Sequence, residues 1–194
     1  MPEPIVPSSS VALNSLYFAV FLDMFGGLMV MPLMQFVALD MHASPFQLGI
    51  LSSMFAFAQV LGSLGMGFLS DKVGRRIVLL VCLATTGVSL ILFGLAQSFM
   101  QLLVFRIMDG FFSGTLGIAQ AMIADLVLPE ERAGAMAKCG SMLGLGLILG
   151  PGVGGLLAPL GFPGVCFVAA GVTFFNFFIA LLSLPKVQTA GARK

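Results

Sequence analysis

Three ionisable side chains, Asp23, Arg106 and Asp109, fall deep within long apolar stretches of the sequence. A charge at the centre of a bilayer is costly unless it is paired or hydrated, and such residues mark proton relays and substrate pathways. Arg106 and Asp109 are three residues apart, so on a helix they share one face and can pair. The pair is either a self-neutralised structural element or part of a polar cavity. Asp23 has no charged partner in its own stretch, which favours a functional carboxylate there.

The elements that must hold these residues are six apolar stretches. Apolar residues make up 59% of the chain and charged residues 9%, and the mean hydropathy is +1.10. A soluble domain needs a more charged surface, whereas lipid accepts apolar side chains on every face of a helix. A stretch of about 20 residues suffices to cross a bilayer. The sequence predicts an all-α, polytopic membrane protein with transmembrane helices at about 12–39, 46–69, 77–97, 100–127, 135–159 and 163–184.

Basic residues predict the orientation of these helices. Apart from Arg106, all of them lie next to or after even-numbered spans: Lys72, Arg75, Arg76, Arg132, Lys138, Lys186, Arg193 and Lys194. The opposite loops carry Asp40 and His42 but no Lys or Arg. By the positive-inside rule, the N-terminal segment 1–11 and the tail 185–194 are cytoplasmic and flank a transmembrane domain at 12–184. The net charge of +1 gives no basis for binding nucleic acid.

Charge also concentrates in "GFLSDKVGRR", between the second and third spans. Asp71 would lie at the partially negative end of one helix, and Arg75 and Arg76 at the partially positive start of the next. Asp125 would lie at the negative end of the fourth span. These placements oppose the helix dipoles and are tolerable if the charges neutralise one another. The sequence therefore predicts a cluster of Asp71, Arg75 and Asp125, with Arg76 more solvated.

Other residues of this stretch have separate interpretations. Gly74 would permit the tight turn between the two helices. Lys72 and Arg76 are either topology-setting positive charges or members of the charged cluster.

The fifth span combines glycine and proline. Gly146, Gly150 and Gly154 recur every four residues and form a groove into which another helix can pack closely. Pro151 lacks the N–H of an internal helical residue and should bend the helix beside the groove. Ordinary close packing of helices is the alternative interpretation.

The positions of the intramembrane charges suggest an internal repeat. Asp23 lies in the first helix of one possible three-helix unit, and Arg106 and Asp109 lie in the first helix of the next. Many secondary transporters contain such units as an inverted 3+3 repeat, with equivalent helices lining one cavity. We therefore expect the three charges to converge.

These stretches together resemble the major facilitator superfamily over nearly the whole chain. "RIMDGFFSG" at 106–114 is similar to its fourth-helix motif, and "GLILGPGVGG" at 146–155 resembles the fifth-helix motif of proton-driven antiporters. "FLDMFGGLMVMPLM" at 21–34 and "ADLVLPEERAGAM" at 124–136 are like the tetracycline-efflux group and its eukaryotic relatives. The charged loop resembles the superfamily's loop signature at Gly67, Asp71, Lys72, Gly74, Arg75 and Arg76.

The sequence departs from the family pattern in three respects. Asp109 stands where the fourth-helix motif usually has a neutral residue, and Gln35 stands where the first-helix pattern often has a second proline. Family members also have twelve or fourteen helices, whereas this chain has six predicted spans.

The resemblance implies a secondary transporter of small solutes that exports them by alternating access with proton coupling. Asp23 would bind and release the proton, and Arg106 would tune this titration. The charged loop would form a cytoplasmic latch that also meets a helix of the opposite half. A complete cavity would need a second six-helix half, from a second copy or another chain. The groove of the fifth span and residues 58–67 of the second are the expected mating surfaces.

A different class of function remains open. The chain could be a truncated product without transport, or a subunit that modulates a full-length relative. An enzyme is disfavoured, because the sole histidine, His42, lies in a loop and the sequence shows no Ser–His pair, metal-ligand spacing or cofactor motif.

Overall fold

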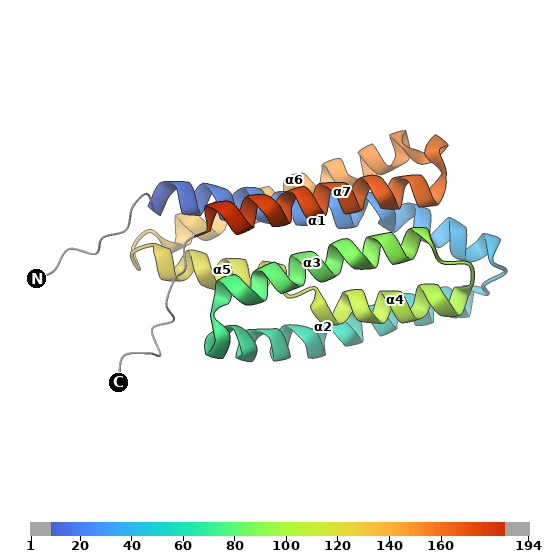
Figure 1. The fold of residues 1–194 in the computed structure, drawn as a ribbon, viewed down its shortest axis with the longest axis horizontal. Helices are drawn as coiled ribbons and strands as arrows, with labels where there is room; N and C mark the ends of the chain where they lie inside the picture. Colours follow the sequence, from blue (N-terminus) through green and yellow to red (C-terminus); the bar gives the residue numbers. More distant parts are fainter. Residues whose placement is uncertain (1–8, 185–194) are drawn as a thin grey trace, which may run out of the picture.

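The computed structural model describes residues 9–184, which form a bundle of helices running back and forth along one axis (Figure 1). The sequence predictions for residues 1–8 and 185–194, including the basic residues of the tail, lie outside the described residues. The helices are α1 (Ser9–Asp40), α2 (Pro45–Val73), α3 (Arg75–Gly94), α4 (Phe99–Phe112), α5 (Thr115–Leu126), α6 (Arg132–Leu156) and α7 (Gly161–Ser183), with a short 3-10 turn, η1 (Ala158–Leu160), before α7.

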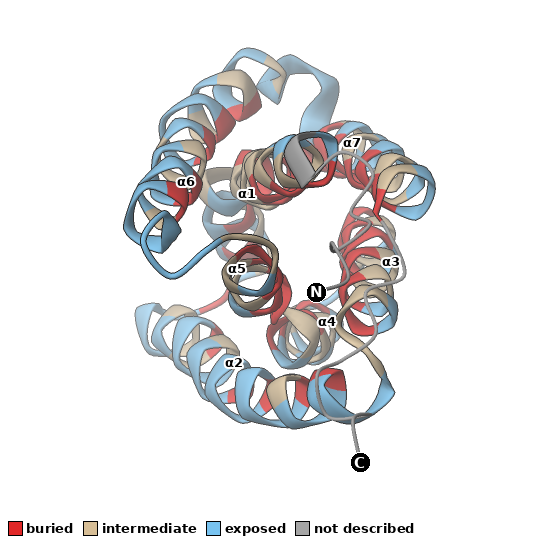
Figure 2. Ribbon diagram, turned by 90° about the vertical axis from the view of Figure 1, so that its left-hand side faces the viewer, coloured by how far each residue is buried: buried red, intermediate tan, exposed pale blue. Residues whose placement is uncertain are grey.

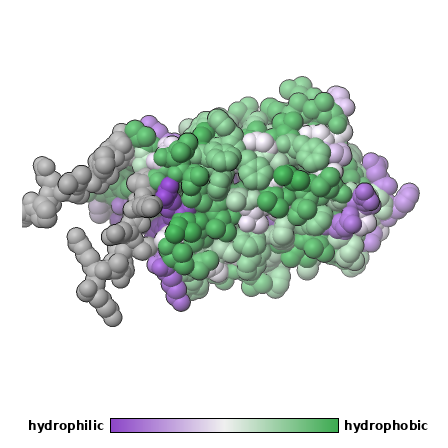
Figure 3. Space-filling view, viewed as in Figure 1, coloured by the Kyte–Doolittle hydropathy of each residue, from purple (hydrophilic) through white to green (hydrophobic). Residues whose placement is uncertain are grey.

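The surface of the bundle is that of a membrane protein. Within residues 9–184, six segments are long and apolar enough to cross a bilayer, with α4 and α5 together forming the fourth. The face of the bundle in Figure 3 is apolar along most of its length, and hydrophilic residues gather at its two ends. Phe57 and Phe68 in α2 and Ile148 in α6 are exposed, and these two helices are largely exposed on the outside of the bundle (Figure 2). The predicted all-α architecture with six spans is confirmed.

Local sequence signals start two of the helices. Ser44 caps α2 by accepting from the backbone N–H of Gln47, whose side chain in turn accepts from the Ser44 N–H. Pro45 follows at the first helical position, where its missing N–H costs nothing. Ser98 caps α4 by accepting from the N–H of Gln101. These caps limit the turns between neighbouring antiparallel helices to a few residues.

The fourth span differs from the single continuous segment predicted at 100–127. The structure divides it into α4 and α5, with Ser113 and Gly114 between them. The carbonyl of Gly110 accepts both the backbone N–H of Ser113, at 3.2 Å, and the Ser113 hydroxyl, at 2.9 Å. This tight i to i+3 turn replaces the next helical hydrogen bond, so α4 ends there. The first N–H groups of α5 consequently have no helical carbonyl to donate to.

The core of the bundle has three layers along its axis. One apolar cluster, which includes Leu16, Leu79 and Ile123, fills one end, and a second, which includes Met34 and Phe93, fills the other. Between them lies a polar belt that contains, apart from Ser70, the buried polar residues that the structure describes: Asp23, Thr86, Ser89, Arg106, Asp109, Thr115, Thr173 and Asn176. The belt gathers polar side chains from α1, α3, α4, α5 and α7 at one depth.

The glycine groove of α6 is filled by α1 of the same chain. A Cβ atom at Gly146 would stand 2.8 Å from the Cβ of Met24, and one at Gly150 would stand 2.9 Å from the carbonyl oxygen of Phe25. Gly154 likewise faces the Met29 backbone. The expectation that this groove is a mating surface for a second half is therefore wrong, because it packs within the chain.

Candidate functional site

A cavity of about 250 Å³ opens in the polar belt. The residues that line it come from α1, α2, α3, α4, α5 and the break between α4 and α5: Asp23, Met24, Gly27, Leu28, Met31, Phe55, Gln59, Thr86, Arg106, Asp109, Ser113 and Leu116. Asp23, Arg106 and Asp109 are all buried. The structure thus brings together, from α1 and α4, the three intramembrane charges singled out in the sequence. This central cavity is the candidate functional site.

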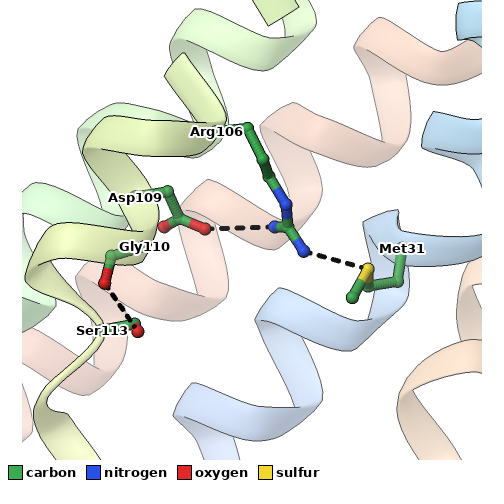
Figure 4. A network of polar contacts seen from close by, with 5 residues as sticks. All are labelled: Met31, Arg106, Asp109, Gly110 and Ser113. Atoms are coloured by element: carbon green, nitrogen blue, oxygen red, sulfur yellow. Dashed lines mark hydrogen bonds and ion pairs between the residues drawn. The ribbon is translucent and has the colours of Figure 1, made fainter. Parts of the chain in front are cut away.

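Arg106 is held by three neighbours. Its Nη1 lies 3.2 Å from Oδ2 of Asp109, one turn further along α4. Its Nη2 lies 3.1 Å from the sulfur of Met31 in α1 (Figure 4). The central carbon of the guanidinium stands 3.7 Å from the centre of the Phe55 ring in α2, close enough for a cation–π interaction. The pairing with Asp109 lowers the cost of burying both charges.

Asp23 is placed differently. Its buried Oδ1 has no hydrogen-bond partner from the described part of the chain. Thr115, the first residue of α5, adjoins the carboxylate without a hydrogen bond of good geometry, and its buried hydroxyl is also unpartnered there. The partially positive N-terminus of α5 therefore lies beside Asp23. Buried oxygen atoms without protein partners are places where a proton or water can bind.

Several cavity residues were missed in the sequence. Met31 and Phe55 carry no charge and are indistinguishable in sequence from lipid-facing residues. Thr86 in the cavity and Thr115 beside Asp23 are compatible with any transmembrane helix, because a threonine hydroxyl can bond to the backbone of its own helix. Gln59 offered a weak signal as an amide within an apolar span.

The charges of the loop between α2 and α3 form a second group, at one end of the bundle. Arg75 Nε lies 2.9 Å from Oδ2 of Asp125 in the last turn of α5, an ion pair without the angle of a hydrogen bond. Arg75 Nη2 lies 3.6 Å from Oδ1 of Asp71 in the last turn of α2. Gly74 alone separates α2 from α3, with a φ of 110° that other residues rarely adopt. The structure thus brings Asp71, Arg75 and Asp125 together.

Lys72 and Arg76 lie outside that cluster. Lys72 is exposed in the last turn of α2. Arg76, which we expected to be more solvated than Arg75, is also half-buried and donates from Nη2 to the carbonyl of Leu181 in the last turn of α7. This contact arises because α3 packs along α7, and a cation is stabilised at a helix C-terminus whose carbonyls lack helical partners.

A groove of about 580 Å³ joins the charged cluster to the break in the fourth span. Asp71 and Arg75 lie at one end of it, and Gln59 and Ser113, which also line the central cavity, lie along it. Gly67 lines the groove, and a Cβ atom there would meet nothing within 4 Å. Gly67 is therefore not required for packing within the described part of the chain.

Comparison of the sequence with known proteins finds transporters. The chain is 30% identical over 182 residues to the quinolone resistance protein NorA of Staphylococcus aureus (strain Mu50), a match that covers 90% of this chain and 46% of NorA. It is 34% identical over 120 residues to the major facilitator superfamily multidrug transporter mfsB of Aspergillus fumigatus, covering 61% of this chain and 20% of that protein. The chain therefore spans about half the length of NorA, and its match covers a smaller share of mfsB.

Solved structures share the fold. The human organic anion transporter MFSD10 superposes with a TM-score of 0.78 at 22% identity, over 95% of this chain and 50% of that one. A bacterial homologue of the human lysosomal transporter Spinster, in an inward-facing and unoccupied conformation, superposes with a TM-score of 0.73 at 20% identity, over 97% and 45%. The family model of the Major Facilitator Superfamily matches residues 16–194. The chain is an integral, multi-pass membrane protein, and it belongs to the Major Facilitator Superfamily, a family of transporters rather than enzymes.

Proposed function

We propose that this chain provides one half of a secondary transporter that exports small solutes by alternating access, driven by protons. The observation that carries the proposal is the central cavity, in which Asp23 lies unpartnered among residues 9–184 beside the Arg106–Asp109 ion pair. Ionisable residues at such a depth are typical of ion and substrate pathways. The names of NorA and mfsB, which refer to quinolone resistance and multidrug transport, support drug-like solutes as the substrates.

Asp23 is the proposed proton carrier. Arg106 has its charge balanced by Asp109, so removal of a proton from Asp23 leaves a negative charge without a dedicated partner. A proton removes this charge, and a bound solute changes its exposure to water. Each therefore changes the free-energy cost of the ionised carboxylate, so that proton binding and solute binding at the cavity are coupled. Arg106 would tune the exchange through its positive charge.

The architecture that we propose around this site is an inverted repeat of two three-helix units, with both termini in the cytoplasm. The convergence of Asp23 from the first span with Arg106 and Asp109 from the fourth supports the repeat. The last turn of α2 and the first turns of α3 and α6 lie at one end of the bundle (Figure 1). The basic residues in these turns, Lys72, Arg75, Arg76 and Arg132, support the orientation.

A second six-helix half, from another copy or another chain, would complete the cavity. NorA is about twice as long as the matched segment, and Met31 and Gln59 line the cavity while remaining exposed. A helix of that half would lie along the groove between α2 and α5. Asp71, whose side chain is 65% exposed, would face the N-terminus of that helix and act as a latch for one conformation.

The test is solute flux together with oligomeric mass. The chain is reconstituted into vesicles, and export of a fluorescent drug-like solute is followed with and without an imposed proton gradient. Mass in mild detergent is measured on the same preparation. Proton-driven flux from an assembly larger than one chain supports the proposal.

A monomeric chain without flux would instead favour the second candidate function, a subunit that modulates a full-length relative. The match to about half of NorA favours that alternative. Co-purification with such a relative, and a change in its flux, would distinguish it.

A further inference from the structure

The Arg106 side chain stands between two cavities. The central cavity of about 250 Å³ lies on one side, and a smaller cavity of about 100 Å³ lies on the other. Arg106, Met31 and Phe55 line both of them. Gln35 and Ser52 add polar groups to the smaller one. A ligand could therefore reach the guanidinium from either side once Met31 moves.

The two ends of the guanidinium have partners of very different strength. Nη1 donates to the Asp109 carboxylate at 3.2 Å. Nη2 donates to the Met31 thioether at 3.1 Å, and a thioether sulfur is a weak acceptor. Hydrogen bonds from Arg to a carboxylate or phosphate are much stronger, and they are often bidentate. Met31 thus occupies a position in which an acidic group would bind Nη2 better.

The surroundings of Nη2 suit a flat apolar molecule that carries such a group. The Phe55 ring covers one face of the guanidinium at 3.7 Å. Leu28 and Leu116 contribute apolar side chains to the wall of the central cavity. Met31 approaches the guanidinium from the side opposite Asp109 (Figure 4). An acid that replaced its sulfur would therefore be kept apart from the carboxylate that already pairs with Nη1.

We propose that Arg106 Nη2, Met31 and Phe55 form a subsite for a carboxylate attached to a flat aromatic body. The carboxylate displaces the Met31 sulfur and pairs with Nη2, and the aromatic body packs against Phe55 and the apolar wall. This inference rests on the proposed function and deepens it by naming the class of solute. Met31 then determines specificity, because it competes weakly for the donor.

The experiment measures binding to the whole 194-residue chain in lipid nanodiscs, without a gradient or flux. The probes are 2-naphthoate and its neutral isostere 2-naphthamide, titrated against the chain. We expect naphthoate to bind at least tenfold more tightly than the amide. Met31→Gln places a better acceptor beside Nη2 and should reduce this preference several-fold, whereas Met31→Leu removes the sulfur and should preserve or increase it.

Met100→Gln is the matched control, since Met100 is an exposed methionine in the first turn of α4 and lines neither cavity. It should leave the preference unchanged. Equal affinity for the two probes, no naphthoate binding, or an equal effect of the two glutamine variants would each overturn the proposal. Because this experiment measures no transport, failure of the subsite proposal leaves the proposed function standing. Conversely, a chain that shows no flux but keeps the naphthoate preference would refute the proposed function and not the subsite.

Discussion

The side-chain amide of Asn176 in α7 donates a hydrogen bond of 2.9 Å to the carbonyl oxygen of Ala19 in α1. In an α-helix this carbonyl also accepts the backbone N–H of the residue four positions on, which is Asp23. A carbonyl oxygen has two lone pairs and can accept both. Asn176 is fully buried, so α7 is tied to α1 at the helical turn that carries the unpartnered carboxylate.

We predict that Asn176→Leu destabilises the folded chain by about 0.5 to 1.5 kcal/mol, the range of interhelical hydrogen bonds in membranes. The loss of stability is limited, because Asn176 Oδ1 is buried without a partner among residues 9–184. The leucine removes this unsatisfied oxygen together with the hydrogen bond. Unfolding in detergent mixtures measures the change. Thr173→Val is the control, since the Thr173 hydroxyl donates to the carbonyl of Ala169 in its own helix and to no other helix of the described chain. Equal losses from both variants would contradict a specific tie between the helices.

Asp23→Asn should abolish the dependence of solute flux on a proton gradient and leave membrane insertion intact. The amide keeps the shape of the side chain but cannot bind and release a proton. Flux in vesicles with and without the gradient measures the effect. Asp40→Asn makes the same change at the exposed end of α1 and should preserve gradient-driven flux. Persistent proton dependence in Asp23→Asn would remove this residue from the coupling mechanism.

Asp71→Asn should change the maximal rate of transport more than the affinity for solute. Its ion pair with Arg75 is long, at 3.6 Å, and exposed, so the loss of stability should stay below about 1 kcal/mol. The effect on rate would arise from the balance between two conformations. Rates measured over a range of solute concentrations separate the two parameters. Lys72→Gln, at the exposed neighbouring position, is the control, and a change confined to affinity would refute the latch.

Gly154→Ala should separate α6 from α1 and destabilise the chain by about 1 to 3 kcal/mol, the usual cost of overpacking. Its new methyl group would collide with the Met29 backbone, which cannot rotate away as a side chain can. Gly152→Ala is the control in the same helix, because a Cβ atom there meets nothing within 4 Å. That variant should be neutral or more stable by up to about 1 kcal/mol, from helix propensity. The free energy of unfolding of the two purified variants, measured in detergent mixtures, tests this prediction.

The charged cluster was largely predictable from the sequence. Asp71, Arg75 and Asp125 lie at helix ends, where chain order and dipole direction already limit the possible partners. The structure places them together. The bond from Arg76 to Leu181 was not predictable, since any exposed helix end can offer a carbonyl to a cation.

The six spans and their apolar character follow from composition alone, because a bilayer requires long apolar helices whatever their arrangement. The same apolar composition hides which face of each helix points inward, since lipid and protein interior favour the same side chains. Only the tertiary structure therefore decided that α1 fills the groove of α6, that the fourth span breaks at Ser113, and that Met31 and Phe55 meet Arg106. Asp23 was recognisable as a costly buried charge, and the packing of α1 against α5, with Arg106 and Asp109 of α4 in the same cavity, determined what lies around it.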